Sequence, residues 1–338
     1  MAVPSQVLAP RSTVRFRPPR FGLGGSQLGW PDEETALATV DAAYQAGIRF
    51  FDTSPAYGES ERRVGTALRR RPRGEFLVST RVVGEDPEES IRKSSQTLGL
   101  TIDLAFLQQD TQGARRGDTQ GVGRGGAEAA GRGGVRGAGG GGVQAGGVPG
   151  VQPGGVQGVG GGVEAGGVQG VGGGGVREVG GGRGVRWEGF EGLGRVRREG
   201  VVRAVGVVGG EWGELERVVR EVELDCVLLT GQYSLLDQQA EPLLDTCLAR
   251  GVSVIVAGAL VLEPETVQAR RISAVCERYG VSLPQAALAF PSRHPAVTSV
   301  LITAASPAEI RADAALVRQP VPERLWKDPE LIGLLSSE

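Results

Sequence analysis

Residues 36–52, ALATVDAAYQAGIRFFD, combine two different structural patterns in immediate succession. The apolar side chains between Ala36 and Tyr44 recur with the spacing of one helical face. Gly47 follows as a typical C-terminal signal of a helix. Residues 48–52, IRFFD, then form a short segment with three large apolar side chains, which is typical of a strand. A helix that passes directly into a strand favours an α/β architecture.

The same alternation recurs outward from this stretch. We expect further strands at 76–80, 102–107, 201–208, 226–229, 252–257 and 297–302, and an opening strand or hairpin near 14–23. We expect helices at 59–70, 87–98, around 215–222, ending near 250, at 264–279, 283–290 and 307–317. Strand–helix alternation indicates a parallel sheet, and eight such units favour a closed (β/α)8 TIM barrel over an open sheet.

A glycine-rich segment, 113–186, interrupts this alternation. It holds 34 of the 57 glycines of the chain, and Val is its only sizeable apolar residue. Such a composition cannot bury enough apolar surface to offset the entropy of ordering the chain. We therefore expect a disordered insertion after the fourth strand, which leaves the barrel through the position of the fourth helix. The 264 residues outside the segment come close to the ~250 of a typical TIM barrel.

Two other interpretations of this segment stay open. Its RGG triplets at Arg124 and Arg132 are a feature of RNA-binding segments, although no aromatic residue is interleaved to stack on bases. The segment also has the character of miscalled or shifted coding sequence, because barrel-like sequence resumes at about Trp187. We predict three regions: the first half of the barrel at 14–112, the low-complexity segment at 113–186 and the second half of the barrel at 187–330.

The overall composition excludes several classes of protein. The chain has 338 residues, and 37 Lys and Arg against 39 Asp and Glu give a net charge of −2, which argues against non-specific nucleic-acid binding. No apolar run approaches the ~20 residues that cross a bilayer, and residues 1–20 lack the apolar region of a secretory signal.

The three cysteines, Cys226, Cys247 and Cys276, form no CxxC pair, so we predict small buried side chains and no metal site. We expect a cytoplasmic monomer.

Functional residues of a TIM barrel lie where the strands meet the following loops, and here these positions resemble a known family. Residues 50–61, FFDTSPAYGESE, resemble the aldo-keto reductase signature FDT-x-x-x-YG-x-S-E. The strings FGLGG at 21–25, GVVRAVGV at 200–207 and GQYSLLDQ at 231–238 add to the similarity. Together they resemble the branch of aldose dehydrogenases that acts on sugars such as galactose and fucose.

This resemblance implies an NAD- or NADP-dependent oxidoreductase that acts on a sugar aldehyde or an aldose. In the family a Tyr exchanges the proton, a Lys lowers its pKa, an Asp pairs with the Lys, and a His steers the substrate oxygen. Asp52 and Tyr57 match two of these positions, but Arg81 stands at the Lys position and Gln108 at the His position. Arginine is not a conservative replacement for lysine, and an amide cannot carry a proton. We therefore expect weakened activity, with His294, the one histidine of the chain, in a structural role.

The resemblance also implies a cofactor site. Tyr233 matches the aromatic residue on which the nicotinamide stacks, and Ser306, Glu309 and Asp313 match the adenosine end. The position that usually supplies a cation for the 2′-phosphate of NADP is Ala305, a change that favours NAD. The alternative function is a catalytically inactive barrel that binds a nucleotide or a protein partner.

Overall fold

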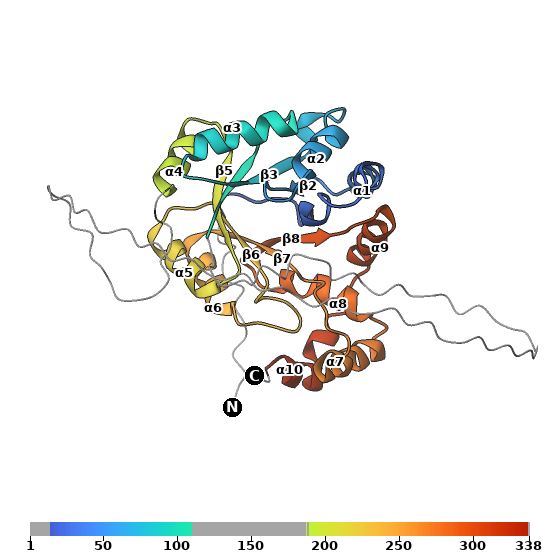
Figure 1. The fold of residues 1–338 in the computed structure, drawn as a ribbon. Helices are drawn as coiled ribbons and strands as arrows, with labels where there is room; N and C mark the ends of the chain where they lie inside the picture. The colour runs from blue at the N-terminus through green and yellow to red at the C-terminus, as the bar shows by residue number, and fades with distance from the viewer. Residues whose placement is uncertain (1–13, 110–186, 188, 337–338) are drawn as a thin grey trace, which may run out of the picture. The chain divides into compact units, whose positions relative to one another are not determined.

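The structure is a computed structural model that describes residues 14–109, 187 and 189–336. Eight parallel strands close into a barrel in sequential order, so the prediction of a (β/α)8 barrel is confirmed (Figure 1). The strands are β1 (Phe21–Gly24), β2 (Phe50–Asp52), β3 (Leu77–Val82), β4 (Leu104–Gln108), β5 (Ala204–Gly209), β6 (Cys226–Thr230), β7 (Ser253–Ala257) and β8 (Val297–Thr303).

Helices surround this barrel, and the ring of helices closes where the last βα unit places α9 beside α1 (Figure 1). The α-helices are α1 (Glu33–Gln45), α2 (Ser60–Leu68), α3 (Pro87–Leu98), α4 (Phe190–Arg198), α5 (Trp212–Glu221), α6 (Glu241–Arg250), α7 (Val267–Arg278), α8 (Leu283–Ala289), α9 (Pro307–Arg318) and α10 (Pro329–Leu335). Short 3-10 turns are η1 (Gly25–Gln27), η2 (Arg73–Glu75), η3 (Pro291–Arg293) and η4 (Leu325–Lys327). In the described part of the chain, no helix has the length and apolar character to span a membrane.

The fourth helix differs from the sequence expectation. We expected the insertion to leave the barrel at this position and predicted no helix there, but α4 is present immediately after the glycine-rich segment. Its buried residues Phe190, Leu193 and Val196 face α3, β4 and β5. The helix has only nine residues and two of them are glycines, so its apolar stripe was too short to stand out beside the glycine-rich tract. The expected disorder of 113–186 concerns residues outside the described ones.

Apolar side chains fill the inside of the barrel. This inner core consists of Phe50, Leu104, Phe106, Ala204, Val208, Cys226, Leu228, Ile255 and Leu301. Close packing there depends on Gly22, because a Cβ on Gly22 would come within 2.7 Å of both Leu301 and Phe50. All three cysteines of the chain are buried and unpaired, as predicted.

Polar side chains stand above the inner core at the carboxyl ends of β2, β3 and β4. Successive side chains of a strand point to opposite faces, so residues two or four positions beyond a core residue also face the inside. Leu77 of β3 also packs against this core. The inward positions beyond Phe50, Leu77 and Phe106 are Asp52, Ser79, Arg81 and Gln108. The barrel therefore gathers a polar cluster at one rim.

Gly65 lets α2 approach α3 closely, since a Cβ at this position would lie 1.8 Å from the carbonyl oxygen of Leu98. We expect Gly65→Ala to lower the free energy of unfolding by about 1–3 kcal/mol, because backbone cannot yield as a flexible side chain does. Gly213→Ala in α5 is the matched control, because nothing lies within 4 Å of its Cβ. The control is expected to be neutral or stabilising by up to about 1 kcal/mol. Urea unfolding measures both, and equal effects would contradict the close approach.

Candidate active site

Four expected residues meet at the rim around one guanidinium. Asp52 ends β2, Gln108 ends β4, Arg81 lies near the end of β3, and Tyr57 lies in the loop after β2. The Cζ atom of Arg81 lies 4.7 Å from the centroid of the Tyr57 ring. Its Nη2 lies 4.0 Å from Oδ2 of Asp52, and its Nη1 donates a hydrogen bond to Oε1 of Gln108 at 3.4 Å. The structure thus brings together the residues that the sequence analysis grouped.

The carboxylate of Asp52 is almost completely buried, with 2% of the residue exposed. Burial raises its pKa, and the positive charge of Arg81 and a hydrogen bond from Ser79 oppose this shift. The Ser79 hydroxyl donates to Oδ1 of Asp52 at 2.6 Å. Sequence analysis did not identify Ser79, although its place two residues before Arg81 puts both side chains on one face of β3.

Burial also raises the pKa of Tyr57, to about 12. The nearby charge of Arg81 lowers this pKa, but the negative charge of Asp52 raises it and burial has the largest effect. A phenol with such a pKa is almost wholly protonated at pH 7. The hydroxyl is therefore suited to donate a proton and poorly suited to accept one at neutral pH.

Two contacts within the protein orient the amide of Gln108. Its Oε1 accepts the hydrogen bond from Arg81, and its Nε2 donates to the carbonyl oxygen of Gln109 at 3.2 Å. An amide held in this way directs its oxygen, not its N–H groups, at the guanidinium. It provides no group that exchanges a proton.

The loop that carries Tyr57 is fixed to the loop after β1. The Ser60 hydroxyl donates to the carbonyl oxygen of Gly25 at 2.9 Å and accepts from the Thr53 hydroxyl at 2.9 Å. Gly29 lies so close that a Cβ there would come within 1.9 Å of the Tyr57 carbonyl oxygen. These contacts explain why small and hydroxyl side chains accompany the tyrosine in the sequence.

The start of α9 presents two of the expected cofactor residues. Ser306 is the N-cap of this helix, and its hydroxyl accepts from the backbone N–H of Glu309 at 3.3 Å. Oε2 of Glu309 in turn accepts from the backbone N–H of Ala305 at 2.9 Å. Asp313 lies one turn further along α9 and is buried. The Glu309 carboxylate is thereby fixed at the amino-terminal end of the helix.

Tyr233 lies in the loop that follows β6. Only 4% of this residue is exposed, and its ring centroid is 5.6 Å from that of Phe290 and 6.2 Å from that of His294. The structure therefore places the ring beside residues that precede β8. The Nε2 atom of His294 lies 3.2 Å from Oδ1 of Asp245, in keeping with the structural role expected of His294.

Short side chains end the strands on the other side of the rim. Thr230 ends β6 and Ala257 ends β7, both half-buried, and the exposed Thr303 ends β8. These side chains carry only methyl and hydroxyl groups, and a lining of this chemistry fits the flat ring of a nicotinamide cofactor. Among the described residues, no three His, Cys, Asp or Glu side chains gather as metal ligands.

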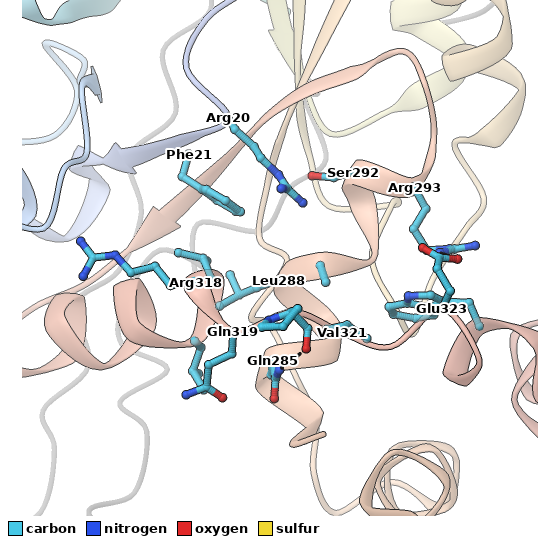
Figure 2. A pocket seen from close by; sticks show the side chains of 15 residues that line it. Arg20, Phe21, Gln285, Leu288, Ser292, Arg293, Arg318, Gln319, Val321 and Glu323 are labelled. Carbon is cyan, nitrogen blue, oxygen red and sulfur yellow. Dashed lines mark hydrogen bonds and ion pairs between the residues drawn. The ribbon is translucent and has the colours of Figure 1, made fainter. Parts of the chain in front are cut away.

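A groove of about 590 Å³ opens at the opposite end of the barrel (Figure 2). Phe21 at the start of β1 lines it, together with residues that precede β8 and the end of α9. Figure 2 shows Arg20 directed toward Ser292, with Arg293 beside Glu323. This groove contains none of the expected site residues. Because TIM-barrel enzymes act at the carboxyl-terminal rim, the rim around Arg81 is the candidate active site.

Comparisons with known proteins identify the family of the chain. A family model described as "Aldo/keto reductase family" matches residues 20–328. A D-threo-aldose 1-dehydrogenase from Pseudomonas sp is 28% identical over 346 residues, which cover 92% of this chain and 92% of that protein. An L-galactose dehydrogenase from Arabidopsis thaliana is 44% identical over 61 residues, 17% of this chain and 19% of that one.

The fold also matches solved structures. An aldo-keto reductase from Bacillus halodurans, in its holo form, matches with a TM-score of 0.62 and 18% identity, over 96% of this chain and 94% of that one. This likeness shows the barrel architecture. The family model and the sequence relatives confirm the resemblance drawn from residues 50–61.

Proposed function

Because the chain belongs to the aldo/keto reductase family, we propose that it is a nicotinamide-dependent oxidoreductase of aldoses or sugar aldehydes. The observation that carries the proposal is the convergence of Asp52 and Tyr57 on the guanidinium of Arg81. The similarity to a D-threo-aldose 1-dehydrogenase supports the sugar substrate.

In the reductive direction, Tyr57 is the proton donor. Its hydroxyl is protonated at neutral pH and donates to the carbonyl oxygen of the substrate. The cofactor, when bound, supplies the hydride. The guanidinium of Arg81 lies beside the ring and stabilises the phenolate that remains. Asp52 balances the charge of Arg81, and the short side chains at the ends of β6, β7 and β8 would line the site of the nicotinamide ring.

Ser306 and Glu309 would hold the adenosine end of the cofactor, and we expect the protein to prefer NAD over NADP. Ala305 provides no cation, and the fixed carboxylate of Glu309 lies 2.9 Å from the Ala305 backbone nitrogen. A 2′-phosphate at this position would meet a negative charge without a cationic partner. We expect Ala305→Arg to lower the Kd for NADP+ by about tenfold, which corresponds to about 1.4 kcal/mol, and to leave the Kd for NAD+ nearly unchanged.

Fluorescence titration with both cofactors measures this change. Ala312→Arg is the matched control, because it adds the same charge to an exposed position further along α9. Tighter NADP+ binding in both variants would indicate a general charge effect. Unchanged NADP+ binding in Ala305→Arg would contradict the placement of the adenosine end.

The activity itself is tested with purified protein, NAD+ and NADP+, and a panel of aldoses. Turnover above that of a Tyr57→Phe variant is expected. No turnover above this control would contradict the proposed function.

A second candidate function is a catalytically inactive barrel that binds a nucleotide or a protein partner. The specific observation that favours it is the polar cluster itself, in which Arg81 and Gln108 bond to each other at 3.4 Å where the family has Lys and His. Cofactor titration separates the two candidates, since binding without turnover supports this second one.

A further inference from the structure

Ser79 lies inside the barrel and belongs to the polar cluster at the rim. It is the register partner of Asp52 across the β2–β3 pair, and none of it is exposed. Its hydroxyl donates to Oδ1 of Asp52 at 2.6 Å. Its backbone carbonyl oxygen accepts from the N–H of Thr53 at 3.0 Å. The side chain is thus fixed by the strand pairing that also places Asp52.

The Asp52 carboxylate has little other support. Within the part of the chain that the structure describes, the hydrogen bond from Ser79 is the one that this carboxylate accepts. Nη2 of Arg81 stays at 4.0 Å from Oδ2, beyond hydrogen-bond distance. A buried carboxylate without donors is costly and tends to become protonated. The Ser79 hydroxyl opposes this tendency directly.

Two titratable side chains face Asp52. Arg81 faces it from β3 and Tyr57 from the loop after β2, whereas its register partner on β1 is Gly24. Glu61 of α2 lies on the outer face of β3, where it accepts from the Thr80 hydroxyl at 2.7 Å. Burial raises the pKa of Asp52, and Arg81 and Ser79 lower it.

We propose that Ser79 is a positioning residue of this active site, whose hydroxyl keeps the Asp52 carboxylate ionised and directed at Arg81. The guanidinium then stays beside the Tyr57 ring. This inference rests on the proposed function of the site. Without the hydroxyl, Asp52 takes up a proton at a higher pH than in the unmodified protein. Arg81 then loses its countercharge and keeps only the 3.4 Å hydrogen bond to Gln108.

The test compares Ser79→Ala with Ser299→Ala. Both serines are fully buried in the barrel strands, but the Ser299 hydroxyl has no hydrogen-bond partner in the described structure. Each variant removes one buried hydroxyl, and only the first removes the donor to Asp52. Any effect common to both reports the cost of an altered barrel interior.

The first readout is the titration of Asp52 by ¹³C NMR in protein labelled at the Asp carboxyl carbons, with Asp52→Asn to assign the signal. A hydrogen bond to a charged carboxylate lowers the pKa of that carboxylate by about one to two units. We expect Ser79→Ala to raise the pKa of Asp52 by that amount and Ser299→Ala to leave it unchanged. An unchanged pKa in Ser79→Ala, or an equal shift in both variants, would overturn the proposal.

The second readout is the pH profile of kcat. The low-pH limb is expected to move upward by the same amount in Ser79→Ala, and Ser79→Thr, which keeps the hydroxyl, is expected to restore it. Should Ser79→Ala not fold, Ser79→Cys replaces it, because a thiol is a weak donor. Absence of turnover in the unmodified protein would contradict the proposed function, whereas the NMR titration needs no turnover and still decides the role of Ser79.

Discussion

The double substitution Arg81→Lys and Gln108→His is expected to raise kcat/KM by about 10²-fold, the lower end of what acid–base assistance provides. The guanidinium of Arg81 spreads its charge over a planar fork, and its centre lies 4.7 Å from the centroid of the Tyr57 ring. A lysine ammonium is a compact charge on a flexible stem, so it places its whole charge at one point beside Tyr57. An imidazole at position 108 adds a group that can both donate to the substrate oxygen and carry a proton, whereas the amide, held by Arg81 and Gln109, cannot carry one.

The two changes are expected to be non-additive, because members of one catalytic unit act together. Steady-state kinetics of both single variants, the double variant and the double variant with Tyr57→Phe measure this. The last variant is expected to return to background, since the proton donor is missing. A double variant that binds cofactor but is as inactive as Tyr57→Phe would show that the site is wrongly assigned.

Much of the fold was predictable because its signals are local. Helix α3 was expected at 87–98 and has those bounds, because Asp86 caps its first turn and Gly99 ends it in a left-handed conformation. The place of Asp52 and Tyr57 at one rim follows in turn from the direction of the strands, since parallel strands bring all their carboxyl ends to one side.

The remaining features depend on contacts that a sequence does not state. The bond from Ser79 to Asp52 requires the register of β2 against β3, which no local pattern fixes. Tyr233 stands in a string typical of the family, yet the structure packs its ring against Phe290. The direction of a side chain in a loop is decided by its neighbours in space, and these come from a distant part of the chain.

Oxidation of an alcohol substrate is expected to accelerate about tenfold for each pH unit between about pH 7 and pH 10. In this direction Tyr57 must accept the proton, so only its deprotonated fraction acts. Burial raises the pKa of Tyr57 to about 12, and below its pKa the deprotonated fraction of a group grows tenfold per unit. In the reductive direction the phenol must be protonated, so the rate is expected to stay flat over the same range.

Measurements of kcat in both directions, with circular dichroism at each pH to verify folding, test this asymmetry. Tyr57→Phe is the control and is expected to remove the slope, since no group at this position then titrates. A plateau of the oxidation rate below about pH 9 would contradict the raised pKa. Reduction is favoured at neutral pH because burial raises the pKa of Tyr57 more than the charge of Arg81 lowers it. The charge of Asp52 offsets part of the effect of Arg81. The phenol therefore stays protonated and can donate its proton to the substrate.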